Sequence, residues 1–192
     1  MTTLLKNIAF VGLLLQALIA SGQSIVWNGS EQPLNITPDV FVAEDKGGQL
    51  GAAEVASAAF APNFARSDKK VLDFKFTHSW FWVKFSVKNE TPEPLVLEVA
   101  QALLDTVQLC FQDSAGQWQS MQSGYSMSIY RKPIVHSLHA FSLPLNTETF
   151  YLHYQATEEP VPLKLWSANG YEAKKTDQTI AYGVYIGIML II

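Results

Sequence analysis

Between residues 81 and 157 the chain alternates apolar and polar side chains with a period of two. Segments 81–88, 95–99, 106–112 and 150–157 each place apolar residues at every second position. Successive side chains of a strand point to opposite faces, so each segment has one apolar face. Residues that favour turns separate the segments at 89–94, 113–116, 144–147 and 158–162. The pattern predicts an all-β fold, an antiparallel β-sandwich.

Helix is expected only at the margins of this body. Residues 51–60 are rich in alanine and predict either one or two helical turns or a surface loop. Residues 45–51 hold glycines and polar side chains, and they predict a turn.

The N-terminus predicts a secretory signal peptide over residues 1–22. Lys6 is followed by an apolar run at residues 8–20 and then by the small residues Ser21 and Gly22. That order of a positive start, an apolar centre and a small-residue cleavage site is typical of such peptides. As a helix the run reaches about 20 Å, less than the roughly 30 Å of a hydrocarbon core. We therefore expect cleavage near Gly22 and export of residues 23–176.

The C-terminus predicts the start of a transmembrane helix. Residues 180–192 carry no charge, yet they too are short for a bilayer of about 30 Å, which indicates that the segment is truncated. Tyr182 and Tyr185 fit the aromatic belt at a membrane surface. Gly183 and Gly187, four residues apart, would give another helix a smooth face to pack on.

The composition excludes several function classes. Net charge is −4 and no basic run is present, which argues against nucleic acid. The single cysteine, Cys110, can form no intrachain disulfide and belongs to no zinc-binding thiol cluster. Its place in an alternating segment predicts a small side chain packed on one face of a strand.

Motifs of catalysis are missing from the sequence. Neither a Gly-x-Ser-x-Gly motif nor a phosphate-binding loop occurs. His136 and His139 would point to opposite faces of a strand, so no metal site is predicted, and no cofactor is expected. A glycosidase remains an alternative only if the fold gathers a pair of carboxylates from Asp73, Asp105, Asp113 and the scattered glutamates. We therefore assign no catalytic residue.

Aromatic residues are the better lead to a ligand site. Trp82 lies on the face opposite Phe81 and Val83, while Trp118 and Tyr130 lie in or near turns. A ring on a sheet surface can stack on a sugar, although tryptophans in sandwiches are also commonly buried in the core.

Arg131 is the second lead, because its planar guanidinium suits a carboxylate or sugar hydroxyls. The alternative is a structural ion pair with Asp105 or Asp113.

These features together resemble the type 2 extracellular domain of bacterial seven-transmembrane receptors with diverse intracellular signalling modules. The likeness spans roughly residues 35 to 168, and residues 182–189 resemble the opening of the family's first membrane helix. It rests on the runs 82–89, 104–109, 150–152 and 162–165 with Gly116, Gly124, Arg131, Phe141, Leu143 and Leu145.

The resemblance implies a jelly-roll sandwich akin to carbohydrate-binding modules, placed in the periplasm beside the bacterial inner membrane. Its partners would be a small molecule, carbohydrate or related, and the membrane through the C-terminal helix; a homodimer is compatible with it. Lys84 and His153 stand where arginines are usual, and lysine loses the bidentate fork. The candidate ligand residues are Trp82, Lys84, Arg131, Trp118 and Tyr130.

The preferred interpretation is a ligand-sensing receptor domain that signals through seven helices to a cytoplasmic output domain. The alternative is a membrane-anchored module that contacts a protein or a glycan without catalysis.

Overall fold

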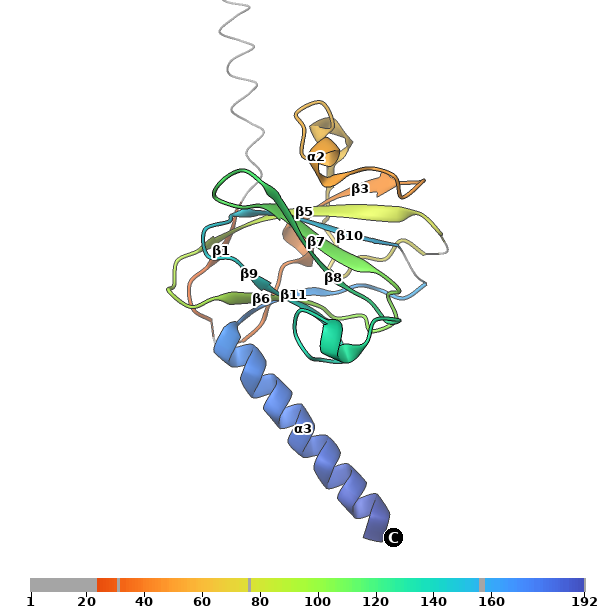
Figure 1. Ribbon diagram of the computed structural model, residues 1–192, viewed down its shortest axis with the longest axis vertical. Helices are drawn as coiled ribbons and strands as arrows, with labels where there is room; N and C mark the ends of the chain where they lie inside the picture. The colour runs from red at the N-terminus through yellow and green to blue at the C-terminus, as the bar shows by residue number, and fades with distance from the viewer. Residues whose placement is uncertain (1–23, 31, 76, 156–157, 192) are drawn as a thin grey trace, which may run out of the picture.

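Two β-sheets stack face to face, and a long helix leaves the sandwich on one side (Figure 1). The computed structural model describes residues 24–30, 32–75, 77–155 and 158–191. The predicted signal peptide lies outside these residues. The described chain confirms the all-β sandwich: its strand pairs are antiparallel, except that the N-terminal strand runs parallel to its neighbour.

The larger sheet has seven strands and the smaller has four. Each of the four segments that the alternation predicted holds a strand among the described residues, and several shorter strands complete the sheets. In spatial order the larger sheet holds β4 (Ala65–Arg66), β3 (Phe41–Asp45), β5 (Trp80–Asn89), β10 (Thr149–Gln155), β7 (Val107–Gln112) and β8 (Trp118–Ser123), with β1 (Ile25–Trp27) on β5. The smaller sheet holds β2 (Leu34–Asn35), β11 (Leu163–Ser167), β6 (Leu95–Val99) and β9 (His139–Leu143).

The main core lies between the sheets. Phe85, Leu109 and Leu152 point inward from the larger sheet and meet Leu97 and Phe141 of the smaller one, all of them buried. Burying one such side chain stabilises the fold by about 1.5–3 kcal/mol. This is the apolar face that the period-two pattern predicted.

β6 and β10 are also buried on their outer faces. A segment between β3 and β4, residues 46–64, crosses the outer face of the larger sheet and contains α2 (Ala52–Val55) and η3 (Ala61–Asn63). The predicted short helix is therefore confirmed. The segment that contains it packs on the outer face of the larger sheet and buries part of that face. Val55 packs there against Trp82, Cys110 and Tyr151.

The predicted turn follows β3 and is held by Asp45. The carboxylate accepts hydrogen bonds from the backbone N–H groups of Gln49 (3.2 Å) and Leu50 (3.0 Å). Gly48 has φ of +63°, and an added Cβ would lie 2.6 Å from the ring of Trp80. Glycine is thus required both by backbone conformation and by space.

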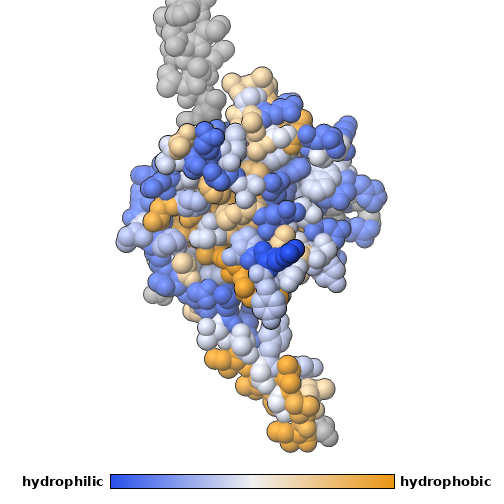
Figure 2. Space-filling view, in the orientation of Figure 1, coloured by the Kyte–Doolittle hydropathy of each residue, from blue (hydrophilic) through white to orange (hydrophobic). Residues whose placement is uncertain are grey.

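Helix α3 (Ala168–Ile191) follows β11 without a linker. Its first turns pack on the outer face of the smaller sheet, and from Ile180 onward its side chains are exposed or only partly covered. Apolar side chains gather on this far end of the helix (Figure 2). Among the described residues, no helix combines the length and the apolarity that a membrane crossing needs.

Candidate functional site

The register of the larger sheet sets outward side chains in rows across its outer face. Trp82 of β5 is paired with His153 of β10, and His153 is paired with Gln108 of β7. In the next row Lys84 is paired with Tyr151. Cross-strand partners on one face lie about 4.5–5.5 Å apart, so each row forms a continuous surface.

A hollow of 370 Å³ opens over the first row, and we call it the outer-face hollow. Trp82, His153 and Gln108 line it on the sheet side. Residues 48–52 of the crossing segment form one wall, and Trp118 of β8 also lines it. Two of the five candidate residues, Trp82 and Trp118, therefore share one site.

The side chains of Trp82 and His153 form a buried stack. Their ring centroids are 4.2 Å apart with an interplanar angle of 11°. Trp82 is only 2% exposed and His153 only 7%. Trp82 is on the predicted face, and of the two alternatives, a ring open to stack on a sugar or a ring buried by packing, the structure has the buried ring, because His153 and the crossing segment cover it.

Two ring nitrogens in this stack have no hydrogen-bond partner among the described residues. They are Nε1 of Trp82 and Nε2 of His153. The nearest charged atom to the histidine nitrogen, Oδ2 of Asp45, is 3.5 Å away, which is long for a hydrogen bond. An unpaired buried polar group costs about 1–3 kcal/mol, so this arrangement favours a ligand or a rearrangement that supplies partners.

His153 is held in its neutral form. Burial lowers its pKa, and the nearby carboxylate of Asp45 opposes that shift without overcoming it. Asp45 in turn is occupied by the backbone N–H groups of the turn. The outer-face hollow therefore offers donors and acceptors without a free positive charge.

Lys84 lies beside this hollow with its charge engaged by aromatic rings. Its Nζ is 6.0 Å from the ring centroid of Phe64 and 5.9 Å from that of Tyr151. Cation–π contacts of this kind are worth about 0.5–2 kcal/mol. Lys84 lines a neighbouring hollow of 380 Å³, and Trp118 lines both.

Trp118 is the candidate ring best placed to meet a ligand. It is half-buried and contacts Tyr151 edge-on, with centroids 5.8 Å apart. It therefore presents ring surface on the boundary between the two hollows.

Tyr130 and Arg131 lie elsewhere, in η4 (Ile129–Arg131) on the side of the sandwich from which α3 leaves (Figure 1). Arg131 lines a separate hollow of 470 Å³ together with Asp105 and Ser128. The five candidates thus form two groups on different sides of the sandwich.

The proposed ion pair of Arg131 with Asp113 is wrong. The Asp113 carboxylate instead accepts hydrogen bonds from the side chain of Gln119 and from the N–H groups of Gln117 and Ala115, which lower its pKa. These contacts close the β7–β8 turn, at the opposite end of β8 from η4. Within the described chain Arg131 makes no ion pair with Asp105 either.

The junction with α3 is the second polar feature, and the sequence did not reveal it. Glu98 of β6 is 1% exposed and forms an ion pair with Lys174 of α3. The Lys174 ammonium also lies 5.1 Å from the ring centroid of Trp166 and 5.2 Å from that of Tyr171. A buried carboxylate needs such a partner, so this pair fixes the base of the helix on the sheet.

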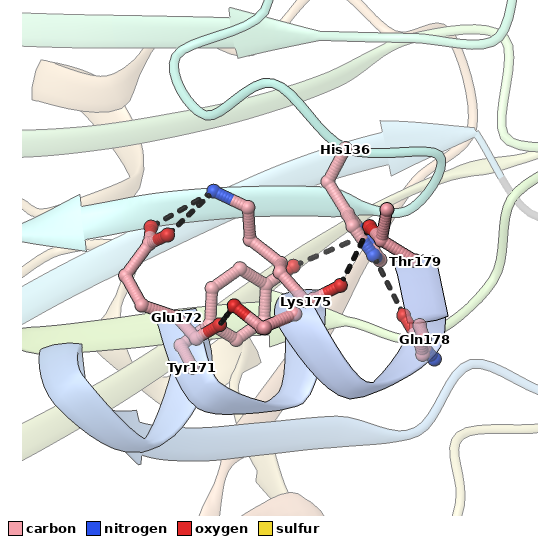
Figure 3. A network of polar contacts seen from close by, with 7 residues as sticks. His136, Tyr171, Glu172, Lys175, Gln178 and Thr179 are labelled. Atoms are coloured by element: carbon pink, nitrogen blue, oxygen red, sulfur yellow. Dashed lines mark hydrogen bonds and ion pairs between the residues drawn. The ribbon is translucent and has the colours of Figure 1, made fainter. Parts of the chain in front are cut away.

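His136 adds a second tie, from the loop between η4 and β9 (Figure 3). Its Nδ1 accepts the hydroxyl of Tyr171 at 3.2 Å and the backbone N–H of Leu138, and Nε2 then donates to Oε1 of Gln178 at 2.9 Å. The loop that carries η4 is therefore bonded to α3 at Tyr171 and at Gln178, about two helical turns apart.

Comparison with known proteins identifies the sandwich. Residues 37–167 match the family described as 7TMR-DISM extracellular 2. The chain belongs to this family. The resemblance drawn from the sequence is confirmed, and the molecule is an extracellular domain of a membrane receptor. No curated protein matches the chain.

The match has structural boundaries. It begins at η2 (Thr37–Asp39) and ends at the last residue of β11, so it covers the sandwich from η2 to the start of α3. Helix α3 therefore begins where this receptor domain ends.

The histidines of the receptor domain do not converge. His136 contacts α3, whereas Nδ1 of the buried His139 is 2.9 Å from Oγ of Ser123. Burial lowers the pKa of His139 to about 4. Across the described residues, no group of three or more His, Cys, Asp or Glu side chains is arranged to hold a metal ion.

Proposed function

We propose that this receptor domain senses a small, neutral, polar ligand, a carbohydrate or a related molecule, in the outer-face hollow. The observation that carries the proposal is that Trp82 and His153 line a hollow in a receptor's extracellular domain, while Nε1 of Trp82 and Nε2 of His153 are buried without a hydrogen-bond partner among the described residues. Pockets that recognise small molecules combine apolar walls with a few polar groups of this kind.

A neutral ligand fits the charges around the hollow. His153 is neutral, Asp45 is already hydrogen-bonded, and Lys84 lies between aromatic rings. Gln108, Gln119 and Ser120 add polar groups along the walls. Trp118 supplies the ring for stacking, in place of Trp82.

Binding at the two nitrogens requires movement, since both are shielded from solvent. Residues 48–52 form a wall of the same hollow, and in this proposal that wall shifts so that a ligand can reach the two nitrogens. A ligand changes a receptor only if it binds one conformation more tightly than another. Displacement of the crossing segment supplies two such conformations.

The signal would then pass to the membrane through α3. In this proposal the apolar part of α3, from Ile180, enters the bacterial inner membrane and leads to further helices and a cytoplasmic output domain. Exposed apolar side chains along this stretch support the insertion, as does membership of a receptor family. The sandwich would lie in the periplasm.

The test is calorimetric titration of the full chain with a panel of neutral mono- and disaccharides. Trp82→Phe and His153→Phe keep the stacked rings but remove the unpartnered nitrogens, and we expect each to weaken binding at least about tenfold, the effect of about 1.4 kcal/mol. Arg131→Ala is the matched control in the other hollow and should bind normally.

Equal affinity in both ring variants and the parent would refute the site. Loss of binding in Arg131→Ala alone would move the site to η4. A chain that binds no small molecule but retains a cell-wall glycan or a periplasmic protein would favour the interaction-module alternative.

A further inference from the structure

Exposed apolar and aromatic side chains surround η4. Tyr125 is 63% exposed, Ile129 40%, Tyr130 85% and Val135 50%. Together with the exposed Arg131 they form what we call the η4 patch. Soluble surfaces seldom gather so many large apolar residues in one short loop, and such patches mark contacts with partners or membranes.

The loop is bonded to α3 at a defined height. His136, one residue after Val135, hydrogen-bonds to Gln178 over 2.9 Å. Gln178 precedes Ile180, where the uncharged stretch of α3 begins, by two residues, which is about 3 Å along a helix axis. The end of the η4 patch at Val135 is therefore held close to the boundary between the polar and the apolar part of α3.

If α3 enters a bilayer, this boundary lies at the surface of the hydrocarbon core; on this point the inference rests on the proposed function. The headgroup region on each side of the hydrocarbon core is roughly 5–7 Å thick. In a bilayer, Ile180 would be the first residue of α3 inside the hydrocarbon core. A group about 3 Å outside Ile180 would then lie within the headgroup region. We propose that the η4 patch contacts the phospholipid headgroups of the membrane that α3 enters.

The side chains of the patch suit this surface. Tyrosine places an apolar ring and a polar hydroxyl at the same depth as lipid headgroups, and Ile129 can reach the acyl boundary. Arg131 has no ion pair within the described residues, so its guanidinium is available for a phosphate.

Charge alone would not hold the patch on the membrane. The ammonium of Lys132 is bonded to the backbone carbonyls of His136 and Ser137, and Asp105 shares the hollow of Arg131. We therefore expect the apolar and aromatic side chains to dominate the contact and anionic lipid to add a smaller effect.

The experiment measures depth in vesicles of phosphatidylethanolamine and phosphatidylglycerol that contain the full chain. An environment-sensitive fluorophore is attached to Tyr130→Cys, to Ser114→Cys in the β7–β8 turn, and to Val184→Cys in α3. Native Cys110 is buried and does not compete for the label. Nitroxides on lipid headgroups or on acyl chains then quench each label according to its depth.

We expect the headgroup nitroxide to reduce the fluorescence at position 130 strongly and that at position 114 little. Acyl-chain nitroxide should quench position 184. Replacing Ile129 with Ser in the Tyr130→Cys chain should reduce quenching at 130 and leave 184 unchanged.

Each other outcome has a distinct meaning. Position 184 deep in the acyl chains with position 130 quenched no more than 114 would overturn the headgroup contact and leave membrane insertion standing. Position 184 outside the acyl chains would refute the insertion itself. Shielding of position 130 that grows with the protein-to-lipid ratio, without lipid quenching, would assign the patch to a second copy of the chain.

Discussion

Replacing Lys174 with methionine tests whether α3 is fixed to the sandwich by the Glu98–Lys174 ion pair. Methionine keeps an apolar stem of similar shape but removes the ammonium. Glu98 is 1% exposed, so the variant leaves a carboxylate buried without its partner. Removing one member of a buried pair costs about 3–5 kcal/mol. The cation–π contacts of the ammonium with Trp166 and Tyr171 are lost as well.

The loss is large against the whole stability of a domain, which is typically about 5–15 kcal/mol. Urea unfolding followed by tryptophan fluorescence measures it. With a slope of about 1–3 kcal/mol per molar urea, a loss of about 3 kcal/mol lowers the midpoint by about 1–3 M.

Two further variants make the measurement specific. Lys175→Met removes a neighbouring lysine whose partner, Glu172, is 66% exposed, and its midpoint should barely move. Combining Glu98→Gln with Lys174→Met removes both charges and should recover most of the lost stability. Equal midpoints for Lys174→Met and Lys175→Met would refute the buried pair as the clamp of α3. A double variant no more stable than Lys174→Met would refute it too.

Other predictions follow from the larger sheet and the core. Gly48→Ala should destabilise the fold by about 1–3 kcal/mol in urea unfolding, because its φ is positive and the new Cβ strikes Trp80; an unchanged midpoint would contradict this. Cys110, whose pKa burial raises to about 11, should resist a thiol reagent at pH 8 until urea unfolds the chain, and rapid labelling of the folded protein would disprove its burial. Burial lowers the pKa of His139 from 6.5 to about 4 in the folded chain. Its contribution to the free energy of unfolding is therefore complete above pH 6.5 and is lost as pH falls towards 4. That loss is about 3 kcal/mol, and His139→Gln should flatten the pH dependence, though His153 will leave some of it.

The long strands could be predicted because periodicity is a local property. β5 runs for ten residues and from Val83 to Lys88 alternates apolar and polar side chains, so its two faces are evident from the sequence. β2 and β4 have two residues each, too few to show any period. They are strands only because neighbouring strands offer hydrogen-bond partners, which depends on tertiary structure.

The site could be predicted only in part, because the burial of a side chain on a sheet depends on which other segments of the chain pack over that face. Alternation placed Trp82 correctly on the outer face, yet its exposure was decided by residues 46–64, which fold over it. Trp82 and Arg131 are both candidate ligand residues on chemical grounds, and the fold places them at different hollows. His153, on the strand that pairs with Trp82, completes the site and was noticed only as a departure from the family.

Glu98 shows what the sequence could have indicated. It is the one charged residue of β6, a strand otherwise made of leucine and valine. A charge in such a run must find a partner or remain in water. The sequence could not show that the partner is Lys174, 76 positions further on, because that contact exists only once α3 packs on the sheet.

The direct continuation of β11 into α3 makes the helix a lever arm with its pivot on the smaller sheet. The helix has 24 residues. At a rise of ~1.5 Å per residue its far end lies about 36 Å from the sheet, and since its first turns are bonded to the sandwich, a rotation of both together by about 10° displaces that end by about 6 Å. A small rotation of the sandwich therefore displaces the far end of α3 by about the pitch of one helical turn.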